Sequence, residues 1–490
     1  MTKLHGILWC RLVSAGVVWA GWLAGACSTP LEQETPPQVD AQTLVALPCT
    51  DSTASIYSAP AGLPPYDATR RGDVVRCARG TALSMQALSA RLVALDVADR
   101  EVHGGVEVFR IVYRTERLAG QPGLSSAVVV LPERPIASTP PLIVFAHGAA
   151  GPSSACAPTR DELARSTVPE SGALLLLAGY GYPVIMPDYA GYLADDPMPQ
   201  GVFLAEDEAH SVLDATRAMH KLLGPDRTSQ QVVLVGHSQG GHAVLSAQAL
   251  ARSYGLAGEL VSVLAFAPVW FPARAMGAII APAAGFTTSA NAGVIGLAVG
   301  YFYSHAELYD GPGSGRALFQ AKAREAVQAF FHSETCESAT LAALGETTSD
   351  FIEPEFLSSI AGCGLGGDCM TGPAATWKER FVADRPQIDP DGADVVLWQG
   401  GADDLVSPPL AQCGIDKLSA DVAEVTGKFE VCADRDADHQ TIMSRHMAWA
   451  ARHIEARTLG ANLPDACPGH EELEREDRVL SCPNPPGNED

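Results

Sequence analysis

Basic residues are scarce in this sequence: 33 lysines and arginines stand against 57 aspartates and glutamates in 490 residues, a formal net charge of −24. A surface this acidic repels phosphate backbones, so we expect no nucleic-acid partner. The sequence also lacks His-Glu-x-x-His, paired Cys-x-x-Cys and Walker motifs. Because these motifs are the usual signals for metal and nucleotide sites, we predict no metal ion and no cofactor.

Long apolar runs are also missing, and the stretch Leu12–Ala26 is too short to span a bilayer comfortably. Lys3 and Arg11 supply positive charge around its start, as in a signal peptide, which we assign to residues 1–26. Its end has two interpretations. Ala24-Gly25-Ala26 is an A-x-A cleavage site for plain secretion, whereas the same residues before Cys27 resemble a bacterial lipobox with Cys27 as the lipidated first residue.

The number of cysteines bears on that choice. The chain has 12 cysteines, and Cys10 leaves with the signal peptide. If Cys27 is lipidated, ten remain, and an even number can pair fully in an oxidising compartment. Plain secretion would leave one free thiol. The parity favours a lipoprotein anchored through Cys27 in a bacterial cell envelope (outer membrane or periplasm), and both interpretations predict export.

The order of apolar patterns indicates an α/β fold. Buried-strand patterns alternate with helical patterns over residues 66–269 and 391–462, which predicts a mostly parallel central sheet flanked by helices. The alternation breaks down over residues 270–390, where we expect an inserted, mainly helical cap. Residues 27–65 are rich in proline, threonine and serine and are expected to form a loose tether. Residues 463–490 are expected to form an acidic peripheral tail.

The stretch Val232–Gly241 carries the strongest motif. Four apolar residues run into Gly236-His237-Ser238-Gln239-Gly240, which fits the G-x-S-x-G nucleophile elbow. In this motif a buried strand turns sharply into a helix and lifts the central serine above the sheet. Ser238 is therefore the expected nucleophile, and the N–H of Gln239 is expected to face an oxyanion. A chance glycine-rich turn is the alternative, but the flanking strand and helix patterns favour the elbow.

A serine nucleophile needs a base and an acid that orients the base. With this elbow the expected order along the chain is Ser, Asp, His. The predicted strand Val395–Trp398 runs into Asp403 and Asp404, and an acid just past a strand end lies at the same sheet edge as the elbow. We favour Asp403. Asp404 is the competitor, and a loop-capping carboxylate is the alternative for either.

The base is expected in a loop after the last strand, and His439 lies in such a loop directly before the last predicted helix. His446 and His453 fall inside that helix and are expected to pack or to face solvent. The aspartates within Asp434–Asp438 lack the glycine turn and terminal glutamate of a calcium-binding EF-hand. We therefore expect a solvated acidic loop there.

The second oxyanion donor should come from the loop after the predicted strand Leu142–Ala146. That loop is His147-Gly148-Ala149-Ala150-Gly151, and its small residues let the backbone approach a substrate. Ala149 is the expected donor.

These motifs together resemble the secretory lipase family, α/β-hydrolases that include the lipase-A type enzymes of yeasts and related bacterial lipases. The resemblance implies an α/β-hydrolase fold with residues 270–390 as a cap over the acyl site. The family spacing G-x-x-D-x-x-V falls on Gly400, Asp403 and Val406, which supports Asp403 over Asp404. The motifs that carry the resemblance are Ile143–Gly151 with Cys156-Ala157-Pro158, Tyr182–Gly191, Gly236–Gly241, Gly400–Val406 and His439.

The function expected from these residues is a serine hydrolase that cleaves carboxylic esters. The resemblance favours a lipase or esterase acting on triacylglycerol or related acyl esters through the triad Ser238, Asp403 and His439. A peptidase or an acyltransferase on the same fold stays open, because fold and triad do not fix the acyl acceptor. A non-catalytic surface lipoprotein is the third hypothesis.

Two expectations concern the cap. The segment Ala278–Tyr303 is glycine- and alanine-rich and largely apolar, so it either packs as the core of the cap or lines an acyl tunnel. The tunnel hypothesis predicts a preference for medium to long acyl chains, with Ile295 and Val299 contributing to the pocket. Cys156, next to the oxyanion loop, is a candidate for a disulfide with a cap cysteine such as Cys336.

Overall fold

The structure is a computed structural model of the whole chain. The predicted signal peptide and Cys27 lie outside the residues that it describes. Chain contacts divide the sequence into Met1–Pro37 and Gln38–Asp490, and all described residues belong to the second unit. The described residues are 45–95, 97, 102–160, 169–194, 196–224, 226–270, 273–282, 285–288, 291–333, 336 and 343–469.

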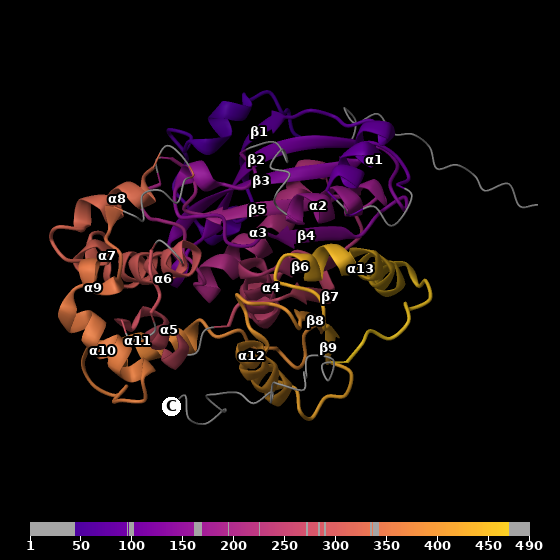
Figure 1. Cartoon of the computed structure of the whole chain (residues 1–490). Coiled ribbons are helices and arrows are strands. Elements are labelled where there is room, and N and C mark those ends of the chain that lie inside the picture. The colour runs from indigo at the N-terminus through magenta and orange to yellow at the C-terminus, as the bar shows by residue number, and fades with distance from the viewer. Residues whose placement is uncertain are drawn as a thin grey trace, which may run out of the picture. The chain divides into compact units, whose positions relative to one another are not determined.

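A nine-stranded sheet lies at the centre, in the order β1-β2-β3-β5-β4-β6-β7-β8-β9 (Figure 1). Pairing is antiparallel from β1 to β5 and parallel from β5 through β4 to β9, as the predicted mostly parallel sheet requires. The strands are β1 Val74–Arg79, β2 Val106–Glu116, β3 Pro122–Pro132, β4 Leu142–Ala146, β5 Val184–Ala190, β6 Gln231–His237, β7 Glu259–Phe266, β8 Asp394–Gly400 and β9 Phe429–Asp434.

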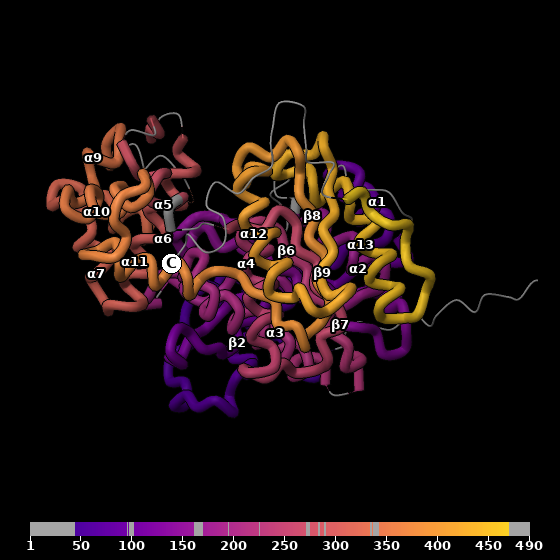
Figure 2. Tube along the Cα trace, turned by 90° about the horizontal axis from the view of Figure 1, so that it is seen from below, coloured from indigo at the N-terminus to yellow at the C-terminus, as the bar shows by residue number. Residues whose placement is uncertain are grey.

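Helices cover both faces of this sheet. Helices α3 (Ala205–Leu223), α4 (Gln239–Leu250) and α12 (Pro408–Asp421) pack on one face, and α1 (Met85–Ala94), α2 (Pro169–Gly179) and α13 (Thr441–Leu459) pack on the other (Figure 2).

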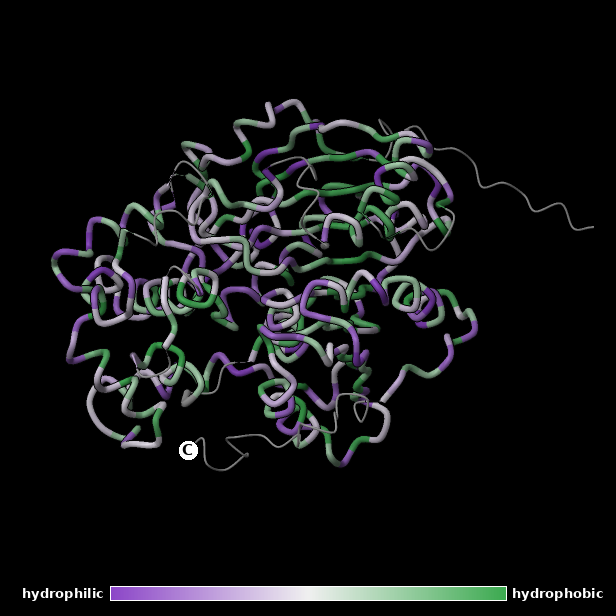
Figure 3. The backbone as a smooth tube through the Cα atoms, viewed as in Figure 1, coloured by the Kyte–Doolittle hydropathy of each residue, from purple (hydrophilic) through white to green (hydrophobic). Residues whose placement is uncertain are grey.

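Strand β4 shows the period of two that produces this arrangement. Its residues alternate between the two apolar clusters, with Val144 in one and Ile143 and Phe145 in the other. A strand buried on both faces needs apolar residues throughout, which is why the strands stand out as apolar in Figure 3.

Between β7 and β8 the chain forms a group of helices with its own apolar core (Figure 1). Aromatic rings dominate that core: the Phe302 ring lies 4.9 Å from that of Trp377 and 5.3 Å from that of Phe356. Ile295 and Val299 are buried in the same cluster. The helices are α5 Ala273–Ile280, α6 Ala292–Asp310, α7 Ser314–Ala317, α8 Arg324–Phe331, α9 Thr348–Phe351, α10 Pro354–Gly364 and α11 Gly372–Ala383.

The described part of the expected tether, residues 45–65, is packed against the fold. Ile56 is fully buried, and the hydroxyl of Tyr57 lies 3.0 Å from that of Thr159. A disulfide joins Cys49 to Cys77 in β1. Apolar residues and a cysteine within the proline-rich composition thus hold this stretch in place, and a loose arm does not describe it.

Further disulfides support the expectation of an oxidised protein. Cys156 pairs with Cys336, as predicted, and Cys363 pairs with Cys369. Cys432 pairs with Cys467, and Cys413 is disulfide-bonded as well. Among the described helices, none combines the length and the apolar character needed to cross a membrane.

Candidate active site

The elbow forms where β6 ends at His237 and α4 begins at Gln239. Ser238, between them, has a φ of 56°, which is strained for a residue with a side chain. A β-carbon on Gly236 would lie 2.1 Å from the carbonyl oxygen of Gly240, and one on Gly240 would lie 1.9 Å from that of Ala146. Only glycine fits at either position, which explains the spacing of the motif.

The three residues predicted as a triad lie in hydrogen-bonding contact. Nε2 of His439 is 2.9 Å from Oγ of Ser238, and its Nδ1 is 2.8 Å from Oδ2 of Asp403. All three side chains are buried, with exposed fractions of 6% or less. If Nδ1–H donates to the carboxylate, Nε2 is left to accept the proton of the serine hydroxyl.

Asp403 is held by the loop that follows β8. Its Oδ1 accepts the N–H groups of Leu405 and Val406 at 3.0 and 2.8 Å, and its Oδ2 faces His439. Asp404, the sequence competitor, is exposed. The loop therefore directs the first of the two aspartates toward the histidine.

The loop after β4 lies beside the elbow. A β-carbon on Gly148 would be 3.4 Å from Cβ of Ser238. The Tyr189 hydroxyl donates to the carbonyl of His147 at 2.9 Å, and the N–H of Gly148 donates to Oε1 of Glu170 at 3.2 Å. Because the Gly148 amide is engaged in this way, Ala149 is the better candidate for an oxyanion donor, together with the N–H of Gln239 at the start of α4.

Three further residues that the sequence analysis considered, His446, His453 and Asp438, have packing or hydrogen-bond partners. The His446 ring stacks on Trp398 at 4.0 Å, and its Nε2 is 2.9 Å from Oδ2 of Asp434. Nε2 of His453 is 3.1 Å from Oγ of Ser262. Asp438 accepts the N–H groups of Gln440 and Thr441 just before α13. These contacts identify His446 and His453 as packing residues and Asp438 as a residue that caps the start of α13.

Sequence reasoning missed a buried contact behind the triad. Nδ1 of His237 is 2.8 Å from Oε1 of Glu170 in the first turn of α2, and its Nε2 donates to the backbone carbonyl of His439 at 2.7 Å. Burial favours the neutral form of both groups. The mutual hydrogen bond and charge outweigh it, so the pKa of His237 lies above its ordinary value and the pKa of Glu170 below. The one signal in the sequence for this contact was the glutamate that precedes the apolar residues of α2.

A second Glu–His pair lies after the serine. Nδ1 of His242 is 2.8 Å from Oε2 of Glu208, and its Nε2 donates to the backbone carbonyl of Asp384 at 2.7 Å. The side-chain amide of Gln239 donates to Oε1 of Glu208. Burial raises the pKa of Glu208. Burial opposes the charge on His242 as well, but the Glu208 carboxylate holds the pKa of His242 above its ordinary value.

Asp384 connects this second pair to the helices between β7 and β8. Its carboxylate accepts the Tyr301 hydroxyl at 2.9 Å and Nε2–H of His305 at 2.7 Å, both from α6. The same carboxylate accepts the N–H of Ala205 at the start of α3. The Glu208–His242 pair thus belongs to a buried polar network that joins α3 and α4 to α6.

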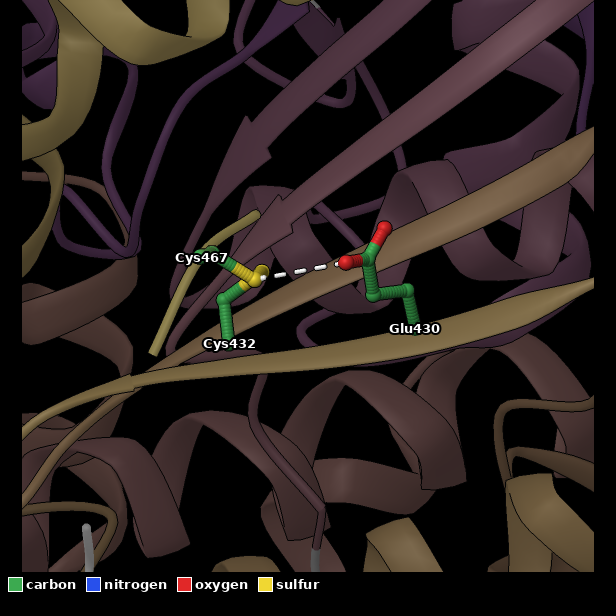
Figure 4. A group of neighbouring side chains, drawn as sticks. All are labelled: Glu430, Cys432 and Cys467. Carbon is green, nitrogen blue, oxygen red and sulfur yellow. Dashed lines mark hydrogen bonds between the residues drawn. A yellow bond between two sulfur atoms is a disulfide. The ribbon is translucent and has the colours of Figure 1, made fainter. Parts of the chain in front are cut away.

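Within the described residues, Glu430, Cys432 and Cys467 form a group whose ligand atoms lie within 4.8 Å of one another (Figure 4). The two sulfur atoms are joined in a disulfide. No thiolate is left there, and a single exposed carboxylate is a poor metal site. Nothing at this group therefore indicates a bound metal ion.

The chain belongs to the alpha/beta hydrolase family, whose family model matches residues 143–452, more than half of its length. Similar solved structures include the rice cell wall degrading esterase LipA from Xanthomonas oryzae. It is 19% identical with a TM-score of 0.58, over 80% of this chain and 99% of that chain. Candida antarctica lipase A is 17% identical with a TM-score of 0.58, over 87% of this chain and 93% of that chain. No curated protein matches the chain.

At these identities the likeness establishes the fold. The chain has the α/β-hydrolase fold, with a mostly parallel sheet flanked by helices. The predicted fold class and the membership of the α/β-hydrolases are confirmed.

Proposed function

We propose that the protein is an exported serine hydrolase that cleaves carboxylic esters, a lipase or esterase. The observation that carries this proposal is the buried hydrogen-bonded chain from Ser238 Oγ through His439 to Asp403. Its location at an elbow between a parallel strand and a helix adds support, because in this fold the nucleophile is presented there.

The proposed reaction has two stages. Oγ of Ser238 attacks the acyl carbonyl while Nε2 of His439 takes its proton, and the N–H groups of Gln239 and Ala149 stabilise the oxyanion. His439 returns the proton to the departing alcohol, which leaves an acyl-enzyme on Ser238. Water then attacks the acyl carbon with His439 again as base, and the acid leaves with Ser238 restored.

The substrate part of the proposal concerns the helices between β7 and β8. We assign them as a cap over the acyl site, with Ala278–Phe302 contributing to the pocket and medium to long acyl chains preferred over acetate. Ile295 and Val299 lie in the cap's own apolar core, which favours packing for these two residues. Bulky substitutions there, assayed across acyl-chain lengths, test the tunnel. Rates that fall steadily beyond short acyl chains, together with no effect of the substitutions, would identify a short-chain esterase with a structural cap.

Hydrolysis of a p-nitrophenyl ester series tests the activity. Ser238→Ala and His439→Ala are expected to abolish turnover while the protein stays folded, and Asp403→Asn to lower kcat by about 10⁴-fold. Asp404→Asn is the matched control, since Asp404 is an exposed neighbour of Asp403. Full activity of Ser238→Ala would refute the proposal. Parallel assays with amides and thioesters separate an esterase from a peptidase or acyltransferase.

Export is supported by the disulfides, because such bonds persist in oxidising compartments. We propose further that Cys27 is the lipidated first residue of the mature protein and anchors it to a membrane. Mass spectrometry of the mature N-terminus tests this proposal: a diacylated Cys27 is expected, and an unmodified Cys27 or a start further along the chain would contradict it.

A further inference from the structure

We propose that Glu170 and His237 form a positioning pair for the ester hydrolysis: their buried contacts fix the oxyanion loop, the nucleophile elbow and the backbone of His439 relative to one another. This inference rests on the proposed function. It adds two residues that do not touch the reacting atoms and that act through the residues that do.

The pair joins three segments that are far apart in the sequence. Oε1 of Glu170 accepts the N–H of Gly148, the residue before the proposed oxyanion donor Ala149, at 3.2 Å. The same oxygen lies 2.8 Å from Nδ1 of His237, the residue before Ser238. Nε2 of His237 then donates to the carbonyl of His439 at 2.7 Å. Each contact therefore ends on, or next to, a residue with a proposed role in the reaction.

The protons of His237 can be counted from these contacts. The His439 carbonyl can only accept, so Nε2 of His237 carries a proton. Oε1 of Glu170 already accepts the Gly148 amide, and the short contact to Nδ1 is satisfied when Nδ1 also donates. An imidazole that donates from both nitrogens is a cation, and the carboxylate of Glu170 is its counter-ion. The pair is consequently neutral as a unit and leaves no uncompensated charge beside the triad.

Glutamine cannot reproduce this arrangement, although it has the shape of glutamate. In Glu170→Gln, one oxygen can accept both bonds only if His237 remains a buried cation without a counter-ion, which is costly. If His237 becomes neutral and keeps its bond to His439, Nδ1 becomes an acceptor that faces the amide oxygen. If the amide turns, its NH₂ group faces the N–H of Gly148. In every case, either a hydrogen bond is lost or an uncompensated charge is buried.

The residues around the pair are packed too closely to rearrange and restore a lost hydrogen bond. A β-carbon on Gly148 would lie 2.9 Å from Oε1 of Glu170 and 3.5 Å from Nδ1 of His237. The His237 ring is also packed against the His439 ring, with centroids 5.0 Å apart. Because the segments touch directly, a lost hydrogen bond moves the oxyanion loop or the His439 backbone. Displacements of about 1 Å in such a site cost on the order of 100-fold in rate.

The test compares Glu170→Gln with the matched control Glu307→Gln in the full chain. Glu307 is similarly buried, with 5% exposed against 4% for Glu170, and it too has two hydrogen-bond partners, here the backbone N–H groups of Gly313 and Gly315. Its bonds join α6 to the start of α7 and involve no residue of the triad. Each protein is labelled to completion with a fluorophosphonate, so that kcat can be expressed per reactive Ser238.

We expect Glu170→Gln to lower kcat per active site roughly 10- to 100-fold, with KM changed less than about twofold, and Glu307→Gln to leave kcat per site unchanged. The apolar variant Glu170→Met is expected to show the same loss. A purely structural role would reduce the number of active sites but not kcat per site, and that outcome would overturn the inference. Absence of ester hydrolysis by the wild-type protein would instead refute the proposed function.

Discussion

The two Glu–His pairs on either side of Ser238 use the same chemistry for different purposes. Both histidines donate one ring N–H to a buried glutamate and the other to a backbone carbonyl. The carbonyl belongs to His439 for the pair at His237 and to Asp384 for the pair at His242. The role of a buried ion pair is therefore determined by the segments that its remaining hydrogen bonds hold.

The pKa values of the two carboxylates are also shifted in opposite directions. The histidine partner lowers the pKa of Glu170 despite burial, whereas burial raises the pKa of Glu208. The first pair holds the loops that carry out the proposed reaction. The second connects α4 to Asp384 and, through Asp384, to Tyr301 and His305 in α6. We expect loss of the first pair to impair chemistry and loss of the second to loosen the helices between β7 and β8.

The largest predicted contrast is in turnover. His237→Gln is expected to lower kcat per active site about 10- to 100-fold, because the backbone carbonyl of His439 loses the imidazole N–H that donates to it. His242→Gln is expected to lower it by less than about tenfold, since that ring contacts no triad residue. Steady-state kinetics normalised to labelled Ser238 measures both. Equal losses would remove the distinction between the pairs.

A smaller contrast is predicted in local opening. Asp384→Asn weakens the acceptors for Tyr301 and His305, so amide hydrogen exchange in α6 is expected to accelerate by about tenfold, equivalent to ~1.4 kcal/mol. Glu170→Gln is expected to leave exchange in α6 unchanged. Hydrogen exchange followed by mass spectrometry makes the comparison. Acceleration of α6 by Glu170→Gln, or none by Asp384→Asn, would contradict it.

The smallest predicted effect is a difference in pH dependence. Because the pKa of Glu170 lies below 4.5 in the folded protein, its contribution to stability grows as pH rises toward 4.5 and is lost as pH falls through the folded value. Because the pKa of Glu208 lies above 4.5, its contribution declines as pH rises through that value.

Urea unfolding of wild type, Glu170→Gln and Glu208→Gln across this range measures the two trends. The stability difference from wild type should rise with pH for Glu170→Gln and fall with pH for Glu208→Gln. If the stability difference changed with pH in the same direction for both variants, the pKa values of the two carboxylates would not be shifted in opposite directions.

The sequence predicts the core of the sheet well, because strands buried on both faces are continuous apolar runs. Leu142–Ala146 is observed as β4 with the predicted bounds. Strand β1 was missed, since Val74–Arg79 contains two arginines and lies at the sheet edge. Residues 317–331 have the apolar spacing of one continuous helix, but the structure interrupts it: α7 ends at Ala317 and α8 begins at Arg324.

The part of the candidate site that could be predicted from the sequence is the part that lies in local motifs. Ser238 and Gln239 follow from the elbow, and Asp403 and His439 from the order of residues after strand ends. The contact between Glu170 and His237 spans 67 residues and has no motif. The contact of His242 with Asp384 spans 142 residues, across the whole group of inserted helices. Such pairings depend on tertiary packing, which a single sequence does not encode as a pattern.

The most direct test of the central claim is the site of covalent modification by a fluorophosphonate. The reagent reacts with serines that are activated by a neighbouring base, so peptide mass spectrometry should find it on Ser238. The account predicts stoichiometric labelling of Ser238 in the wild-type protein, none in Ser238→Ala, and strongly slowed labelling in His439→Ala. Ester hydrolysis by a protein in which Ser238 stays unlabelled, or carries no more label than other serines, would contradict it.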